Sequence, residues 1–125
     1  MKKFFVIICA ALLIAGCGNN YKHLSHEDAK IMIESNPDVI VLDVRTKEEY
    51  GRKHIPNALL MPIEELRNDD FSKLPDKDAT ILIYCWTGRR AEDSAQILIE
   101  HGYKNVYEMG GIVDWEGSIS GVDLK

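Results

Sequence analysis

A chain of 125 residues is long enough for one modest domain with a single core. Its 15 lysines and arginines against 20 aspartates and glutamates give a formal net charge of −5, which argues against partners such as nucleic acid and against adsorption to anionic lipid. The three cysteines, Cys9, Cys17 and Cys85, contain no C-x-x-C pair, which excludes a dithiol oxidoreductase and a thiolate-rich zinc site.

The first segment of the chain, residues 1–16, has the pattern of a secretory signal peptide. Two lysines precede an uncharged apolar run from Phe4 to Ile14, and small residues follow it. This run is shorter than the roughly 20 residues that a helix needs to span a bilayer. We therefore expect cleavage before Cys17, a short tether over residues 17–20 and a domain over residues 21–125.

The stretch Leu13–Cys17 resembles the lipobox of bacterial lipoproteins, in which the cysteine becomes the first residue after cleavage and is acylated through its sulfur. The resemblance implies a lipid, such as palmitate, on Cys17 and a membrane anchor in the bacterial cell envelope that faces outside the cytoplasm. The alternative is an ordinary signal peptide with Cys17 as an incidental thiol. We favour the lipoprotein because the motif directly follows an apolar run, and Cys85 is then the only free thiol.

The rest of the chain alternates helical and strand patterns without an internal repeat. Apolar, β-branched runs bounded by turn residues predict buried strands, and signals such as the capping box of Thr46 and Glu49 predict helix starts. In chain order, the predicted elements are a helix over 25–35, a strand over 39–42, a short helix over 46–51, a short strand over 58–61, a helix start at Pro62, a strand over 81–84, a helix over 89–101, a strand over 105–109 and a final short helix containing Trp115. This alternation predicts an α/β domain with a mainly parallel sheet.

The strongest chemical signal is the run from Cys85 to Ala91, which directly follows the predicted strand over 81–84. A glycine-containing turn there aims backbone N–H groups at the sulfur, and the next helix adds the positive end of its dipole. We therefore expect Cys85 to ionise readily and to hold an anionic sulfur species. Arg90 can donate two parallel hydrogen bonds to an oxyanion over the sulfur, whereas Arg89 faces either the pocket mouth or solvent. The alternative is a buried structural cysteine.

The cysteine loop and three further segments resemble one family. The loop resembles the C-x-x-G-x-R active-site loop of the rhodanese sulfurtransferases and consists of Cys85, Trp86, Thr87, Gly88, Arg89 and Arg90. Residues 42–50 resemble the family's D-V-R…E-[YF] segment, residues 54–58 its H-I-x-G-A turn, and residues 110–115 its G-G-x-x-x-W ending. The four segments occur in the family's order and cover nearly all of residues 21–115.

The resemblance implies a rhodanese-like fold, with five parallel strands flanked by helices on both faces. It also implies that the Cys85 thiolate takes a sulfane sulfur from thiosulfate or a similar small anionic donor, and that a thiol, a protein or cyanide then accepts it. No metal and no organic cofactor are implied, because the cysteine persulfide carries the sulfur. The residues implied to bind substrate are Trp86, Thr87, Gly88, Arg89 and Arg90.

Several residues around this loop have structural interpretations. Asp43, at the end of a strand, is interpreted as a partner of Arg45 that orders the loops around the site, rather than as a catalytic acid or base. The chain departs from the family at Ala91, where many members have Ser, and at Asn57, where Gly is usual. Asn tolerates a left-handed conformation, so we expect the turn at Asn57 to be kept.

Two other functions remain open. Cysteine phosphatases, some of which share this fold, use a C-x5-R loop that is one residue longer, whereas the sixth residue after Cys85 is Ala91. The shorter loop fits a sulfur atom better than a phosphoryl group. A non-enzymatic persulfide carrier, redox sensor or interaction module is the other alternative, because an exposed thiolate in an oxidising compartment also suits sensing.

Overall fold

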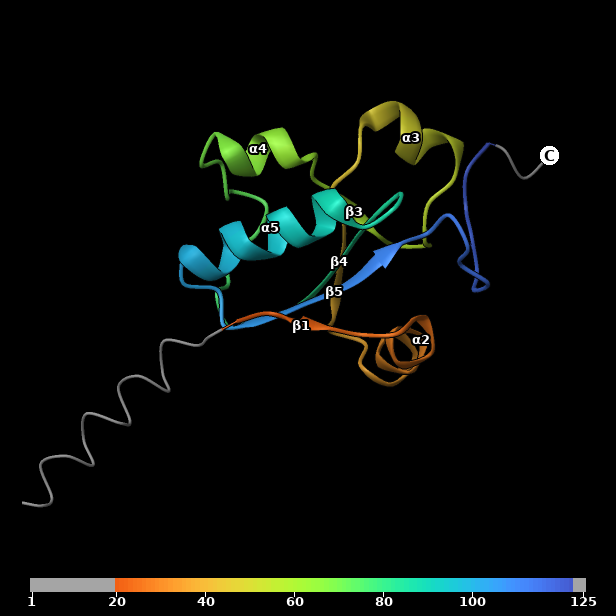
Figure 1. The fold of residues 1–125 in the computed structure, drawn as a ribbon, viewed down its shortest axis with the longest axis horizontal. Coiled ribbons are helices and arrows are strands. Elements are labelled where there is room, and N and C mark those ends of the chain that lie inside the picture. The colour runs from red at the N-terminus through yellow and green to blue at the C-terminus, as the bar shows by residue number, and fades with distance from the viewer. Residues whose placement is uncertain (1–19, 123–125) are drawn as a thin grey trace, which may run out of the picture.

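The computed structural model of the chain describes residues 20–122, so the predictions for the signal peptide, Cys17 and residues 17–19 lie outside the described residues. Five strands form one sheet in the order β1-β5-β4-β2-β3 (Figure 1). They are β1 (Lys22–His23), β2 (Ile40–Asp43), β3 (Leu59–Leu60), β4 (Thr80–Cys85) and β5 (Asn105–Gly111). Every pairing between neighbouring strands is parallel, which confirms the predicted sheet.

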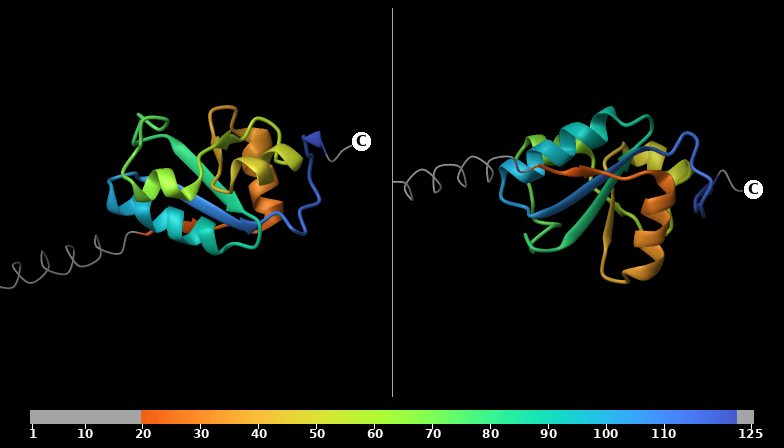
Figure 2. Two further views of the ribbon diagram at one scale, coloured as in Figure 1. Left: turned by 90° about the horizontal axis from the view of Figure 1, so that it is seen from above. Right: turned by 60° about the horizontal axis from the view of Figure 1, so that its bottom comes forward.

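Helices cover both faces of this sheet, with α4 and α5 on one face and α2 on the other (Figures 1 and 2). The helices are α2 (His26–Ser35), α3 (Lys47–Arg52), α4 (Ile63–Arg67) and α5 (Arg89–Glu100). Side chains alternate along β2 and β4, so one set packs under α4 and α5 and the next set packs against α2. This two-sided burial explains why both strands read as continuous apolar runs. Within residues 20–122, no helix has the length and apolar character that crossing a membrane requires.

The predicted helix starts are confirmed at atomic detail. The Ser25 hydroxyl accepts a hydrogen bond from the N–H of Asp28 at 3.1 Å, which caps α2. At α3, the Thr46 side chain accepts from the N–H of Glu49 while the Glu49 carboxylate accepts from the N–H of Thr46, so the capping box is complete. These local contacts place the start of α3 directly after the carboxyl end of β2.

The final helix predicted after the last strand is wrong. β5 continues through Gly111, and the chain then follows turns instead of a helix. The N–H of Ile112 donates to the carbonyl of Cys85 at 3.0 Å, and the N–H of Val113 donates to the carbonyl of Trp86 at 3.2 Å. These bonds hold the segment against the cysteine loop.

Of three smaller features, two differ from the sequence prediction and one confirms it. β1 was not predicted, because Lys22 and His23 are two exposed polar residues without an apolar pattern. Trp115, placed by sequence in a helix, instead lies in a turn, where its half-buried ring packs on the α2 side and meets the His26 ring edge-on at 5.2 Å. The left-handed turn expected at Asn57 is present, with φ of 68°.

Candidate active site

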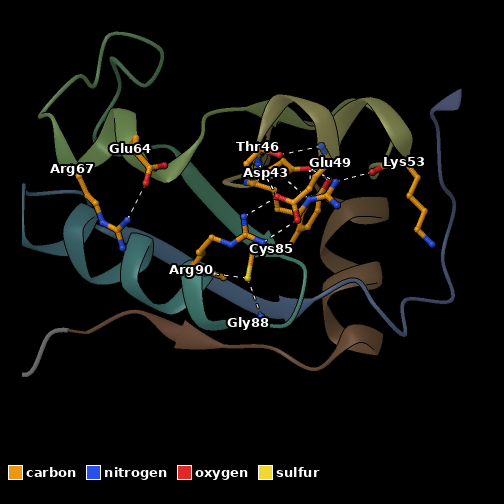
Figure 3. Close-up of polar contacts among 12 residues, drawn as sticks. Asp43, Thr46, Glu49, Lys53, Glu64, Arg67, Cys85, Gly88 and Arg90 are labelled. Atoms are coloured by element: carbon orange, nitrogen blue, oxygen red, sulfur yellow. Dashed lines mark hydrogen bonds and ion pairs between the residues drawn. The ribbon is translucent and has the colours of Figure 1, made fainter. Parts of the chain in front are cut away.

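Cys85 ends β4, in the middle of the sheet, and its sulfur accepts hydrogen bonds from two backbone N–H groups (Figure 3). The N–H of Gly88 lies 2.9 Å from Sγ and the N–H of Ala91 lies 3.4 Å from it. Gly88 has φ of +119°, which lets the loop curl around the sulfur before α5 begins. Converging N–H groups at a helix start stabilise a sulfur anion.

The sulfur lies at the floor of this loop, because Cys85 is only 1% exposed. A cavity of about 340 Å³ beside the loop is lined in part by the neighbouring Trp86. Such burial alone also fits a structural cysteine, but a structural cysteine does not need two N–H donors directed at its sulfur. The two directed donors therefore favour a functional cysteine over a structural one.

Arg90 makes a two-pronged contact that the sequence did not predict. Its Nη1 and Nη2 donate to Oε1 and Oε2 of Glu49 at 2.8 and 3.1 Å (Figure 3). The hydrogen bonds from Arg90 lower the pKa of Glu49 to about 2. The pKa of Arg90 is raised, mainly by its hydrogen bonds to Glu49 and in smaller part by the charge of Cys85. Arg90 is therefore a permanent cation close to the sulfur, and its two terminal nitrogens are already bound to Glu49.

Replacing Glu49 with Gln is expected to remove a pH-dependent part of the stability. Because folding lowers the pKa of Glu49 from about 4.5 to about 2, the contribution is complete above pH 4.5 and is lost as the pH falls toward 2. Both side chains are about one third exposed, so solvent screening limits the contribution to about 1 kcal/mol. Urea unfolding of both proteins between pH 7 and pH 2.5 measures it, and Gln preserves the capping contact. A difference that stays constant across this range would contradict the assignment.

Asp43 and Arg45 form the buried pair that the sequence interpretation placed beside the site. Nη2 and Nε of Arg45 lie 2.8 and 3.0 Å from the Asp43 carboxylate, and both residues are at most 2% exposed. Nη2 of Arg45 also donates to the carbonyl of Lys53 at 2.7 Å. The pair therefore ties the end of β2 to the segment that follows α3, which is a structural role.

Tyr84 completes this network, although the sequence analysis did not single it out. Its hydroxyl donates to Oδ2 of Asp43 at 2.6 Å and accepts from the N–H of Ile55 at 3.1 Å. Burial and the neighbouring Asp43 charge raise the pKa of Tyr84. The sequence did contain a signal for this contact. Tyr84 brings a hydroxyl into an otherwise apolar strand, and a buried hydroxyl needs a partner such as the Asp43 carboxylate.

The other predicted loop residues differ in their surroundings. Thr87 and Arg89 are exposed, and Trp86 is half-buried. Ala91 still donates its N–H to the sulfur, so the backbone contact survives without the hydroxyl that many family members have. Gly111 was recognised only as part of a motif, yet a Cβ there would lie 1.9 Å from the Trp86 carbonyl oxygen. Only glycine lets β5 approach the cysteine loop this closely.

The fold and the loop together define an α/β protein with a cysteine at the carboxyl edge of a parallel sheet, its sulfur facing two backbone N–H donors. The family model of the rhodanese-like domain matches residues 25–118, and the chain belongs to this family. The thiosulfate sulfurtransferase GlpE of Coxiella burnetii is 35% identical over 97 residues, covering 77% of this chain and 88% of that protein. The structure of a rhodanese with anions from E. coli matches with a TM-score of 0.61 at 31% identity, covering 67% of this chain and 99% of that one.

Relatives with other names also contain this domain. A tRNA uridine(34) hydroxylase of Hamiltonella defensa is 32% identical over 109 residues, which are 82% of this chain but 30% of that protein. Membership of the family therefore establishes a rhodanese-like domain with named sulfurtransferases among its relatives. The reaction of this chain has to be argued from its own site.

Proposed function

We propose that this protein is a sulfurtransferase that moves a sulfane sulfur from thiosulfate, or a similar small anionic donor, to a thiol or cyanide through a Cys85 persulfide. The observation that carries the proposal is the pair of N–H groups at 2.9 and 3.4 Å from Sγ. These groups supply the stabilisation that a thiolate and a persulfide anion both need. The similarity to a named thiosulfate sulfurtransferase supports the same chemistry.

The proposed reaction balances without a cofactor. The Cys85 thiolate attacks the outer sulfur of thiosulfate, an S–S bond forms on the cysteine, and the S–S bond of thiosulfate breaks with its electron pair leaving on sulfite. A thiolate or cyanide then attacks the terminal sulfur of the persulfide. The Cys85–sulfur bond breaks, its electron pair returns to the Cys85 thiolate, and a new persulfide or thiocyanate leaves.

The structure favours this chemistry over that of a cysteine phosphatase. The loop closes on the sulfur itself, because the N–H of Ala91 is a direct hydrogen-bond donor to Sγ. The arginine of the loop is Arg90, and both of its terminal nitrogens donate to Glu49, so they are not free to bind a phosphoryl group. Both features fit a small sulfur anion better than a tetrahedral phosphoryl group.

Intact-mass measurement with a thiosulfate:cyanide assay tests the proposal. Incubation with thiosulfate is expected to add the mass of one sulfur atom, which peptide mapping assigns to Cys85. Cyanide is then expected to remove it and release thiocyanate over many turnovers. Absence of both the adduct and thiocyanate would overturn the proposal. An adduct without turnover would instead indicate a persulfide carrier and would overturn the enzymatic assignment.

Replacing Arg90 with Ala is expected to lower kcat/KM for thiosulfate about 10- to 100-fold, because the dianion loses a cation close to the sulfur. Alkylation of Cys85 by neutral iodoacetamide is expected to slow less than about threefold, because no anion has to bind. Steady-state kinetics and alkylation rates measure the two effects, with Arg67→Ala as an exposed control. Equal losses in both reactions would contradict an anion-binding role for Arg90.

We also propose that the domain is anchored to a membrane of the bacterial cell envelope through a lipid on Cys17. The support is the lipobox-like stretch Leu13–Cys17 after an apolar run, with a tether of only a few residues before the domain. Mass spectrometry of protein isolated from its own membranes is expected to find acyl chains on the Cys17 peptide. Recovery of the uncleaved chain, or of Cys17 without lipid, would overturn the anchor.

A further inference from the structure

The cavity beside the Cys85 loop contains more positive charge than the proposed chemistry uses. Its lining residues come from the end of β2, from α3 and the residue after it, and from the cysteine loop, and they are Arg45, Glu49, Arg52, Lys53 and Trp86. Trp86 belongs to the cysteine loop and Glu49 holds Arg90 of the same loop, so the cavity lies beside the loop, and Cys85 itself is not part of its lining. Its volume of about 340 Å³ leaves room for a ligand larger than thiosulfate.

Two of the four charged residues in this cavity are already neutralised by a partner. Arg45 is paired with Asp43, and Glu49 is paired with Arg90. Arg52 and Lys53 are not, because within residues 20–122 no carboxylate lies within ion-pair distance of either side chain. An acidic chain thus places two uncompensated cations in a cavity beside the loop of its candidate nucleophile.

Trp86 gives one of these cations, the Lys53 ammonium group, a defined place. Nζ of Lys53 lies 5.5 Å from the centroid of the Trp86 ring, within the range of a cation–π contact. This contact holds the ammonium group on the cysteine-loop side of the cavity. The side chain of Arg52, in the last turn of α3, supplies the second cation of the lining. A carboxylate bound here meets two positive charges and an apolar ring.

We propose that Arg52, Lys53 and Trp86 form an anion subsite that binds the carboxylate of a small carboxylated thiol, the sulfur acceptor; this assignment rests on the proposed function. Thiosulfate does not fit the role, because its charged oxygens lie only two bonds from the sulfur that Cys85 attacks and must remain next to the loop N–H groups. An acceptor thiol carries its carboxylate several bonds from its sulfur. Such a molecule places its thiolate at the persulfide and its carboxylate in the cavity.

Acceptor kinetics with matched thiols test the subsite. The acceptors are mercaptosuccinate, which carries carboxylates, and 2-mercaptoethanol, which does not. In the double variant Arg52→Gln/Lys53→Gln, KM for mercaptosuccinate is expected to rise about 5- to 20-fold. KM for 2-mercaptoethanol, cyanide and thiosulfate is expected to change less than twofold. Lys104→Gln, at an exposed lysine far along the chain, is the control and is expected to change none of these values.

Each other outcome overturns the assignment. An equal rise for both thiols would show a general effect on the loop instead of carboxylate binding. A rise for thiosulfate without one for mercaptosuccinate would assign the subsite to the donor. Unchanged values for every substrate would show that Arg52 and Lys53 bind nothing that matters to turnover.

A binding measurement separates the failure of the subsite from the failure of the proposed function. Trp115→Phe leaves Trp86 as the only tryptophan, so its fluorescence reports on the cavity. Titration with succinate, which has no thiol, is expected to give a saturable change that Arg52→Gln/Lys53→Gln abolishes. Saturable succinate binding without sulfur transfer would support the anion subsite and overturn the proposed sulfurtransferase activity. Sulfur transfer without succinate binding would support the proposed enzyme and overturn the subsite.

Discussion

Replacing Cys85 with Ser is expected to reduce sulfur transfer by about 1,000-fold or more, which corresponds to about 4 kcal/mol of activation free energy. A hydroxyl oxygen is not ionised near neutral pH and cannot form the persulfide that carries the sulfur. The Ser hydroxyl can still accept hydrogen bonds from the N–H groups of Gly88 and Ala91, so the fold is expected to be kept. Thiocyanate formation and intact mass after incubation with thiosulfate measure the loss.

The other two cysteines supply a matched control for this experiment. In a chain produced without signal-peptide cleavage or lipidation, where Cys9 and Cys17 keep free thiols, Cys9→Ser and Cys17→Ser each remove one thiol outside the loop, and both are expected to retain the turnover and the sulfur adduct at Cys85. If Cys85→Ser keeps its melting temperature and still transfers sulfur at a rate near that of wild type, Cys85 is not the nucleophile. Adduct formation that follows Cys17 instead of Cys85 would lead to the same conclusion.

The sheet could be predicted because burial of its central strands is a local property of their sequences. Residues 40–42 of β2 and 81–83 of β4 are all apolar, since one set of side chains packs under α5 and the other against α2. β1 has no such signal, and only its pairing with β5 defines it as a strand. The segment with the wrongly predicted helix at Trp115 is likewise held by distant contacts, since the N–H groups of residues 112–113 donate to carbonyls of the cysteine loop.

The candidate site shows the same division between local and distant contacts. The cradle around Cys85 is formed within seven residues, so strand, glycine and helix start were enough to predict it. The partner of Arg90 is Glu49, 41 residues earlier, and no local pattern pairs these two residues. Glu49 was recognised as part of the family's D-V-R…E-[YF] segment and for capping α3, a role that it also performs. One carboxylate therefore fixes the start of a helix and holds the arginine beside the sulfur.

Replacing Asp43 with Ala is expected to lower the free energy of unfolding by about 3–5 kcal/mol, because the buried Arg45 guanidinium loses its carboxylate and the Tyr84 hydroxyl loses an acceptor. The loss of stability is expected to affect the candidate site as well, since Arg45 also donates a hydrogen bond to the carbonyl of Lys53.

Urea unfolding at pH 7 measures this loss. The matched control is Asp78→Ala, which breaks an exposed ion pair with Lys104 and is expected to cost less than about 0.5 kcal/mol. If Asp43→Ala does not fold, Tyr84→Phe probes the same network, because it removes one hydrogen bond to the carboxylate and leaves the N–H of Ile55 without an acceptor. We expect about 1.5–3 kcal/mol for that variant. Losses no larger than that of Asp78→Ala in both variants would show that the buried network does not stabilise the fold around Cys85.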